Sequence, residues 1–143
     1  IRGDMDALPV TETTGLPYAS TARAVTPEGL EIGVMHACGH DMHVTNLIGS
    51  ATLLADLRDQ WRGTLVILAQ PAEELGKGAL NMLNDGLLQR IPMPDYALAL
   101  HVSSEVPAGT IGYVSGWTAA NVDTVKITIH GRGGHGARPN DTI

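Results

Sequence analysis

The sequence predicts an α/β fold with a mainly parallel sheet. Two short segments, residues 64–69 and 96–101, are almost continuously apolar, which is typical of strands buried on both faces of a parallel sheet. Residues 44–57 and 77–88 carry apolar side chains at the spacing of amphipathic helices. We therefore expect an α/β domain in which these helices pack against the sheet.

The composition excludes several classes of protein. The 143 residues suffice for one modest domain, and 43% hydrophobic and 17% charged residues are ordinary for a globular protein. A net charge of -6 argues against binding to nucleic acid, and no apolar segment is long enough to cross a membrane. One cysteine cannot form an internal disulfide, so we expect a reducing, cytoplasmic location. Because the chain runs from Ile1 to Ile143 without terminal signals, we expect a segment of a longer protein.

Two carboxylates stand near the beginning of the chain. Asp4 and Asp6 are two residues apart in an alternating stretch that Pro9 ends, so they would share one face of a strand end. A solvated acidic strand end is an equally good interpretation of these residues alone. Residues 11–34 are rich in Thr, Ser, Gly and Pro, which predicts a long ordered loop beside a site.

Residues 36–43 concentrate three histidines and the single cysteine of the chain. Cys38 and His40 are two apart, and Gly39 between them permits a tight turn that directs both side chains to one point. Thiolate and imidazole are preferred ligands of zinc, so this segment predicts a metal site. The alternative is a histidine-rich loop that contains a buried cysteine.

The metal-binding segment is expected to precede a helix directly. Asp41 is the predicted N-cap of the helix over residues 44–57. The positive end of the helix dipole would then favour a thiolate at Cys38 over a thiol.

Ligand-type side chains also follow both apolar segments. Glu73 and Glu74 come after the first, and His101 ends the second. Adjacent carboxylates at the end of a buried strand are unfavourable unless they are paired or bind a cation, and open α/β sheets place their sites at this edge. The alternatives are a solvated acidic turn and a structural histidine.

A second domain is predicted to begin near residue 119. Residues 122–130 alternate apolar and polar side chains, as a half-buried strand does, unlike the earlier apolar segments. The glycine-rich residues 131–139 lack the lysine and the spacing of a phosphate-binding loop, so nucleotide binding is rejected. The predicted domains are therefore residues 1–118 and residues 119–143.

Taken together, these motifs resemble one known family. The sequence is similar to the metal-dependent amidohydrolases that include hippurate hydrolase, N-acyl-amino-acid amidohydrolases and the auxin-conjugate hydrolases, within the aminoacylase and carboxypeptidase group of zinc peptidases. The matching segments occur in family order over nearly the whole chain: residues 4–9, 35–43, 70–74, 99–101 and 131–136.

The resemblance implies a partial catalytic domain over residues 1–118 and the start of an α+β lid or dimerisation domain over residues 119–143. It also implies a role for each matching residue. The family's metal ligands correspond to Cys38, His40, Glu74 and His101. Its catalytic residues correspond to Glu73 as general base, Asp6 as support of the site, and His135 as a lid-domain histidine that reaches the substrate. Three further histidines match no ligand and are expected to be structural: His36, His43 and His130.

The implied activity is metal-dependent hydrolysis of the amide bond of N-acyl amino acids or small peptide-like conjugates. The resemblance implies two divalent ions per full-length site, with zinc expected ahead of manganese, cobalt or nickel, and a homodimer or higher homo-oligomer formed through the lid domain. The family's last ligand, a histidine near the C-terminus of a longer chain, has no counterpart here, and the loop over residues 21–33 is longer than expected.

Two interpretations from other classes remain open. In a cysteine hydrolase, Cys38 would be the nucleophile and a nearby histidine the base, but the two adjacent glutamates would have no role. In a non-catalytic metal-binding domain, the incomplete ligand set would be sufficient.

Overall fold

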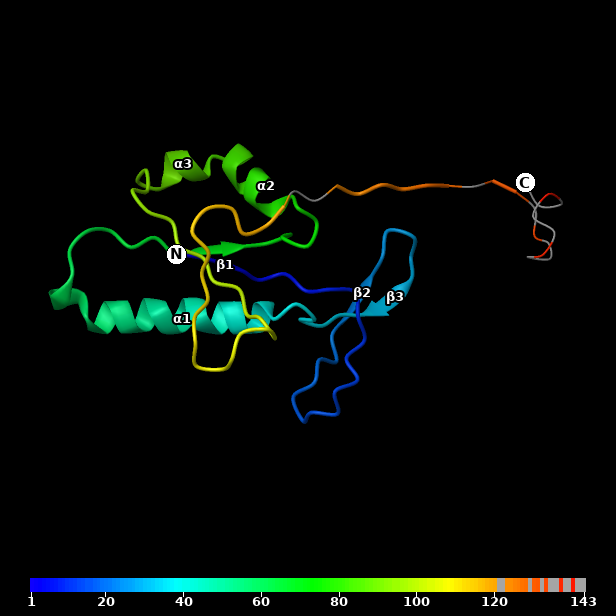
Figure 1. Ribbon diagram of the computed structural model, residues 1–143, viewed down its shortest axis with the longest axis horizontal. Coiled ribbons are helices and arrows are strands. Elements are labelled where there is room, and N and C mark those ends of the chain that lie inside the picture. The colour runs from blue at the N-terminus through cyan, green and yellow to red at the C-terminus, as the bar shows by residue number, and fades with distance from the viewer. Residues whose placement is uncertain (121–122, 129, 132, 134–136, 138–139, 141–143) are drawn as a thin grey trace. The chain divides into compact units, whose positions relative to one another are not determined.

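A computed structural model describes residues 1–120, 123–128, 130–131, 133, 137 and 140. The chain divides into two units, Ile1–Glu105 and Val106–Ile143. The first unit contains all the helices and strands with assigned bounds and is the α/β part of the chain (Figure 1). No helix of the described residues is long and apolar enough to cross a membrane.

The centre of the first unit is a short parallel sheet. Strand β1 (Arg2–Asp4) pairs in parallel with β4 (Leu68–Gln70), in a register that places Asp4 beside Gln70. On its other side β1 makes one parallel bridge, from Arg2 to Ala99. The carboxyl ends of these three segments therefore meet at one edge.

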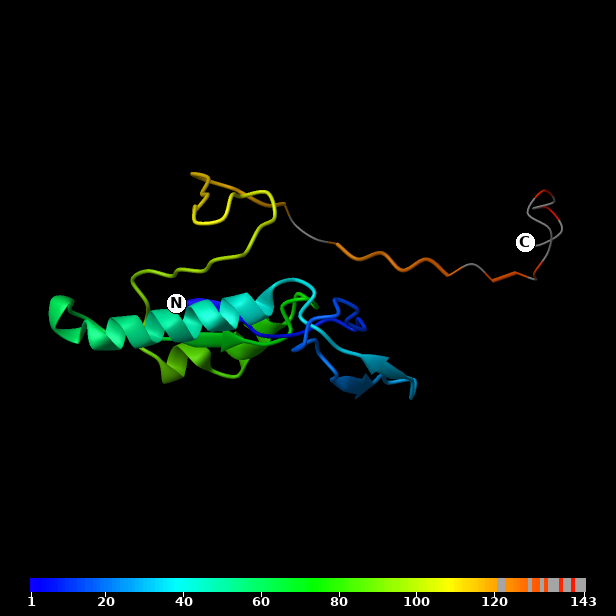
Figure 2. The same cartoon turned by 90° about the horizontal axis from the view of Figure 1, so that it is seen from below.

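Helices lie on both faces of this sheet (Figures 1 and 2). Helix α1 (His40–Asp56) packs against β1, whereas α2 (Gly78–Asn84) contacts β4 and leads into α3 (Leu87–Arg90). A 3-10 turn, η1 (Arg58–Gln60), follows α1. The Trp61 indole N–H donates to the carbonyl of Leu54 at 2.7 Å, which fixes the chain where it leaves α1.

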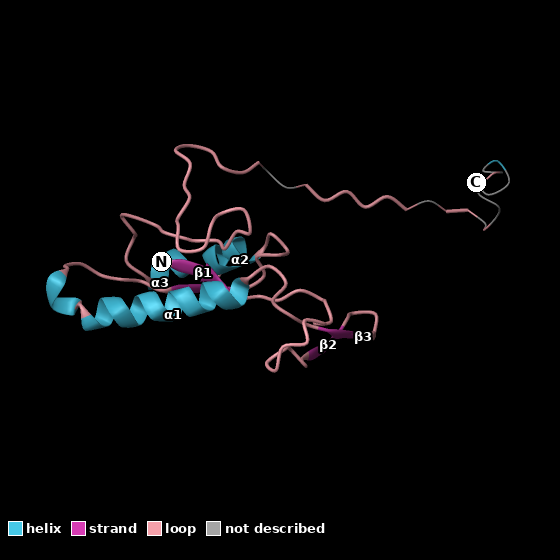
Figure 3. Ribbon diagram, turned by 60° about the horizontal axis from the view of Figure 1, so that its bottom comes forward, coloured by secondary structure: helices cyan, strands magenta, loops and turns pink. Residues whose placement is uncertain are grey.

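The loop over residues 11–34 is more regular than predicted. It contains an antiparallel hairpin of β2 (Arg23–Val25) and β3 (Glu31–Gly33), in which Arg23 pairs with Gly33. Figure 3 shows this hairpin apart from the layer formed by α1 and β1. The sequence signal was weak because the loop residues are polar and small and the strands are only three residues long.

Three predicted features of the elements are wrong. Helix α1 begins at His40, after Gly39 in the left-handed conformation (φ 78°), and no side chain caps it, so Asp41 is a first-turn residue and not the N-cap. The first apolar segment forms a strand only at β4, in which Leu68 is half-buried and Ala69 exposed. Among the described residues β4 pairs with β1 alone, so it is not a central strand. The second apolar segment contributes only the isolated bridge.

The predicted helix over residues 77–88 is interrupted. Gly86 adopts a positive φ of 87°, which ends the helical path after α2 and starts the short α3. The predicted strand at 122–130 is absent from residues 123–128, and Val122 and Ile129 lie outside the described residues. The boundary after residue 118 and the lid domain remain predictions.

Burial in the described residues is mainly polar. Leu47 on α1 is the buried hydrophobic side chain there, at 6% exposure, and four polar or charged residues are buried beside it: Asp4, His40, His43 and Gln70. Polar groups are buried at a free-energy cost unless they are bonded or hold a ligand. The centre of this unit is therefore arranged around polar chemistry.

The acidic residues 73–74 lie in a tight turn between β4 and α2. The backbone N–H groups of Lys77 and Gly78 both donate to the carbonyl of Ala72, at 3.2 and 3.0 Å, and Ala72 itself has a positive φ of 50°. A Cβ atom at Gly78 would lie 1.5 Å from the carbonyl oxygen of Pro71. Only glycine at this position allows the turn to close against the helix.

Gly78→Ala should therefore disrupt the turn. The clash is with backbone, so it should lower the free energy of unfolding by more than the about 1–3 kcal/mol of ordinary overpacking. Gly49→Ala on α1 is the matched control, because a Cβ there meets no atom of the described residues within 4 Å. Urea unfolding of both variants in the full-length protein checks this, and equal stabilities would contradict the described turn.

Candidate metal centre

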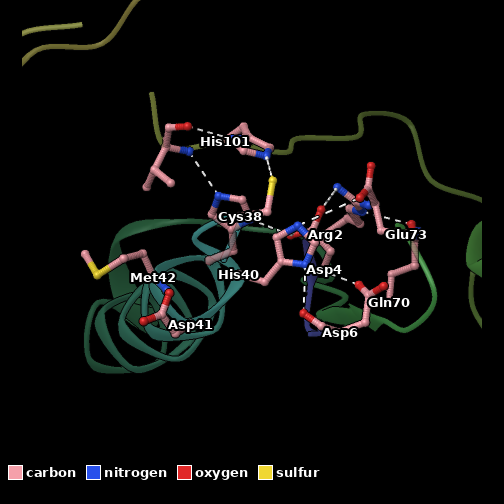
Figure 4. Close-up of polar contacts among 12 residues, drawn as sticks. Arg2, Asp4, Asp6, Cys38, His40, Asp41, Met42, Gln70, Glu73 and His101 are labelled. Atoms are coloured by element: carbon pink, nitrogen blue, oxygen red, sulfur yellow. Dashed lines mark hydrogen bonds and ion pairs between the residues drawn. The ribbon is translucent and has the colours of Figure 1, made fainter. Parts of the chain in front are cut away.

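Four segments bring ligand-type side chains to the carboxyl edge of the sheet. Cys38 lies in the loop before α1, and His40 is the first residue of α1. Glu73 and Glu74 lie in the turn after β4. His101 lies in the segment that follows the bridge at Ala99. The side chains of Cys38, His40, Glu73 and His101 lie together in Figure 4. The ligand atoms of Cys38, His40 and His101 lie within 4.8 Å of one another, as do those of His40, Glu73 and Glu74.

His40 is the shared member of both groups. Its side chain is 1% exposed, and its Nδ1 lies 3.0 Å from the backbone carbonyl of Asp6. A carbonyl can only accept, so Nδ1 carries the proton and Nε2 has a free lone pair. This Nε2 is buried without a hydrogen-bond partner and lies 3.8 Å from carboxylate oxygens of Glu73 and Glu74.

His101 has the same tautomer for the same reason. Its Nδ1 donates to the backbone carbonyl of Val102 at 2.6 Å, so its Nε2 also presents a lone pair. That Nε2 lies 3.6 Å from the sulfur of Cys38. Two imidazoles and one thiol therefore present their ligand atoms to a common volume.

Asp6 supports this arrangement from the end of β1. One of its carboxylate oxygens accepts the backbone N–H of Glu74 at 3.0 Å, and the other lies 3.2 Å from His40 Nδ1. Burial is the largest single effect and raises the pKa of Asp6, but the other interactions, led by the backbone N–H groups of Glu74 and Glu73, together lower it by more, so the pKa lies below its ordinary value. The ionised carboxylate holds the acidic turn through the Glu74 N–H, and the backbone carbonyl of the same residue fixes the tautomer of His40.

Cys38 lies in surroundings that disfavour its ionisation. Burial, followed by the negative charge of Glu74, raises the pKa of the thiol above its ordinary value. A divalent cation among these residues would reverse the effect, because it would neutralise the carboxylates and stabilise the thiolate. The residues fit a metal ion: a buried, unpartnered imidazole nitrogen faces sulfur, nitrogen and oxygen donors, the set that zinc accepts.

A buried pair that the sequence analysis did not anticipate lies behind this centre. The Asp4 carboxylate accepts a hydrogen bond from His43 Nδ1, and the Arg2 guanidinium lies 2.8 Å from its second oxygen. Burial is the largest single effect and raises the pKa of Asp4, but the other interactions, led by the His43 hydrogen bond and the charge of Arg2, together lower it by more. His43 Nε2 is also occupied, by the backbone N–H of Val102 at 3.0 Å, so His43 has no lone pair left for a metal.

The structure thus brings six of the seven candidate site residues together: Asp6, Cys38, His40, Glu73, Glu74 and His101. The seventh, His135, lies outside the described residues. His36 is exposed and donates from Nδ1 to the carbonyl of Asp6 at 3.1 Å, a structural contact of the kind expected. No signal in the sequence could have paired Asp4 with His43, because 39 residues separate them.

The family model for the peptidase family M20/M25/M40 matches residues 1–142. The chain belongs to this family. The resemblance inferred from the motifs is therefore confirmed over the whole chain, including those segments that the structure does not describe.

Similar proteins of this family carry names of amide-cleaving enzymes. The chain is 43% identical over 141 residues to N-acetyl-L-cysteine deacetylase of Bacillus subtilis, covering 99% of the chain and 31% of that relative. It is 42% identical over 145 residues to thermostable carboxypeptidase 1 of Saccharolobus solfataricus, covering 100% and 34%. It is 43% identical over 145 residues to N-acetyldiaminopimelate deacetylase of Bacillus cytotoxicus, covering 99% and 35%. The chain thus spans about a third of the length of these relatives, and no solved structure matches it.

If Cys38 is a metal ligand, bound metal should protect it from alkylation. The zinc-loaded full-length protein should react slowly with iodoacetamide at Cys38, and removal of the metal by a chelator should speed the reaction. Mass spectrometry of the peptide that contains Cys38 measures the rate separately from any other cysteine. Equal rates with and without metal would show that Cys38 is not a ligand.

Proposed function

We propose that the protein is a metal-dependent amidohydrolase that cleaves N-acyl amino acids or small peptide-like conjugates into a carboxylic acid and an amino acid. The observation that carries this proposal is the buried, unpartnered His40 Nε2 amid sulfur, imidazole and carboxylate donors. The deacetylase names of similar proteins favour N-acyl amino acids over longer peptides. Hippurate-like conjugates belong to the same substrate class.

In this proposal four residues hold the metal: Cys38, His40, Glu74 and His101. A bound zinc ion supplies the Lewis acidity that lets water act as a nucleophile at neutral pH and that polarises the amide carbonyl. The sulfur and nitrogen donors favour zinc over manganese, cobalt or nickel. We further propose a second divalent ion in the full-length site.

The two glutamates differ in a way that supports different roles. Glu74 is held through its backbone N–H by Asp6 and its side chain is 23% exposed, whereas the Glu73 side chain is 39% exposed. A ligand benefits from a fixed position, and a general base must reach water and substrate. Glu73 would take a proton from the attacking water and deliver it to the amine nitrogen as the carbon–nitrogen bond breaks.

The alternative of a cysteine nucleophile is less well supported. A nucleophilic cysteine needs a lowered pKa, whereas burial and Glu74 raise the pKa of Cys38. A non-catalytic metal-binding domain would need no base beside the ligands, yet Glu73 lies 3.8 Å from His40 Nε2. The peptidase family to which the chain belongs also favours a metal-dependent hydrolase over both alternatives.

Partners and location follow from the same proposal. We infer a homodimer or higher homo-oligomer through the lid domain, in which His135 reaches the substrate. The single cysteine of the chain and a thiolate-containing metal centre are suited to the reducing cytoplasm.

Replacing each glutamate separately tests the mechanism. Glu73→Gln keeps size and polarity but removes the base, so kcat in the full-length enzyme should fall about 10²- to 10⁴-fold or more while bound metal stays near the wild-type level. Glu74→Gln should lose metal together with activity. The two measurements are kcat on an N-acetyl amino acid and metal content by mass spectrometry.

Each rival mechanism predicts another result. A cysteine nucleophile requires Glu73→Gln to remain active and chelators to have little effect. A metal-binding domain without catalysis requires no hydrolysis by the wild-type protein. A Glu73→Gln enzyme that kept most of its activity would contradict the proposed role of Glu73.

A further inference from the structure

A continuous chain of polar contacts runs behind the metal centre, with the buried Asp4 and His43 in its middle. Gln70 accepts from the Arg2 guanidinium at 2.9 Å, and Arg2 lies 2.8 Å from one oxygen of Asp4. The other oxygen of Asp4 accepts from His43, whose Nε2 accepts the backbone N–H of Val102 at 3.0 Å. The chain of contacts crosses from β4 through β1 and α1 to the segment that carries His101.

The direction of each hydrogen bond in this chain is determined. A backbone N–H can only donate, so the Nε2 of His43 is the acceptor and its proton is on Nδ1, directed at the Asp4 carboxylate. Asp4 is 1% exposed and His43 is 3% exposed, so water does not compete with the bond between them, whereas the bond to Val102 is part-buried. The imidazole is thus fixed in ring orientation and in tautomer.

Val102 is held a second time, by packing. A Cβ atom built on Gly39 would lie 2.3 Å from Cγ2 of Val102, so the Val102 side chain lies directly on the Gly39 backbone. Gly39 is the residue between Cys38 and His40, and Val102 follows His101 in the chain. The His43 ring also lies edge-on to the His101 ring, with centroids 4.5 Å apart.

We propose that His43 is a positioning residue for the metal centre. Its hydrogen bond to the backbone of Val102 holds the segment that carries His101 against the turn between Cys38 and His40. The side chain of His101 therefore lies close to those of Cys38 and His40. This inference rests on the proposed function, because it assumes that Cys38, His40 and His101 bind a metal. Asp4 and Arg2 hold the ring, but the bond to Val102 positions His101.

Two substitutions at His43 separate its two hydrogen bonds. In His43→Gln the side-chain amide reaches the place of Nε2 and can still accept from Val102, but the contact with Asp4 is lost. In His43→Asn the amide nitrogen takes the place of Nδ1 and can still donate to Asp4, but nothing reaches Val102. Both variants are polar, so neither buries an apolar group in the place of the ring.

The first readout needs no metal and no activity. In the metal-free full-length protein, hydrogen exchange at the Val102 amide should remain slow in His43→Gln and become faster in His43→Asn. Equally slow exchange in both variants, or equally fast exchange, would overturn the assignment of the Val102 bond to His43. This result is independent of whether the protein is a hydrolase.

The second readout is zinc affinity, measured by competition with a chelating dye. Residues that orient metal ligands typically contribute about 10- to 100-fold to metal affinity. His43→Asn should lose affinity in this range, and His43→Gln should stay within a few-fold of wild type even if its thermal stability is lower. Equal losses in the two variants would overturn the proposal.

Leu47→Ala is the matched control for general destabilisation. Leu47 lies about one helical turn after His43 and packs beside Gly3 of β1, but it takes no part in the polar chain. It should lower thermal stability without a matching loss of zinc affinity. If the loss of zinc affinity follows the loss of thermal stability across all three variants, His43 is a merely structural residue and the proposal is overturned. A wild-type protein that binds no zinc would instead refute the proposed function.

Discussion

The arrangement of this unit depends on one buried imidazole. His40 starts α1, yet it lies in the interior, where its Nδ1 is bonded to the backbone of Asp6 and its Nε2 has no partner. A buried polar atom without a partner is unfavourable and uncommon in folded proteins. The arrangement is reasonable only if another group satisfies Nε2, and the donors around it are those of a metal site.

The backbone around His40 is shaped to make this possible. The parallel register of β1 and β4 brings Asp6 next to the acidic turn, and the Glu74 N–H bond ties the two segments together. The left-handed Gly39 turns the chain sharply between Cys38 and His40. Sheet register and turn conformation, rather than a large apolar core, therefore determine where the ligand atoms lie.

The grouping of the ligand-type side chains could be predicted from the sequence better than the elements that carry them. Cysteine, histidine and paired glutamates indicate a metal site by their residue types and spacing. The parallel arrangement of the strands explains why the segments that carry them meet at one edge of the sheet. Element bounds were less predictable: the apolar segment before Gln70 pairs only where β1 runs beside it, so most of that segment lies outside β4. Asp41 was mistaken for a cap because the turn at Gly39 starts the helix earlier.

The hydrogen-bond partners of His43 could not be predicted from local sequence patterns. It was expected to be structural because it matches no ligand, and its occupied nitrogens agree with that expectation as far as metal binding is concerned. Its partners, Asp4 and Val102, are 39 and 59 residues away, and only the packing of α1 on β1 brings the three together. Long-range pairings of this kind follow from tertiary structure and cannot be inferred from spacing.

The most direct test of the central claim is X-ray absorption at the zinc edge of the zinc-loaded full-length protein. The account predicts a sulfur scatterer at about 2.3 Å together with nitrogen or oxygen scatterers at about 2.0–2.2 Å. The sulfur signal should disappear in Cys38→Ser while scattering from the lighter atoms remains. A spectrum of the wild-type protein without sulfur, or a sulfur signal unchanged by the substitution, would contradict a metal centre built on Cys38 and His40.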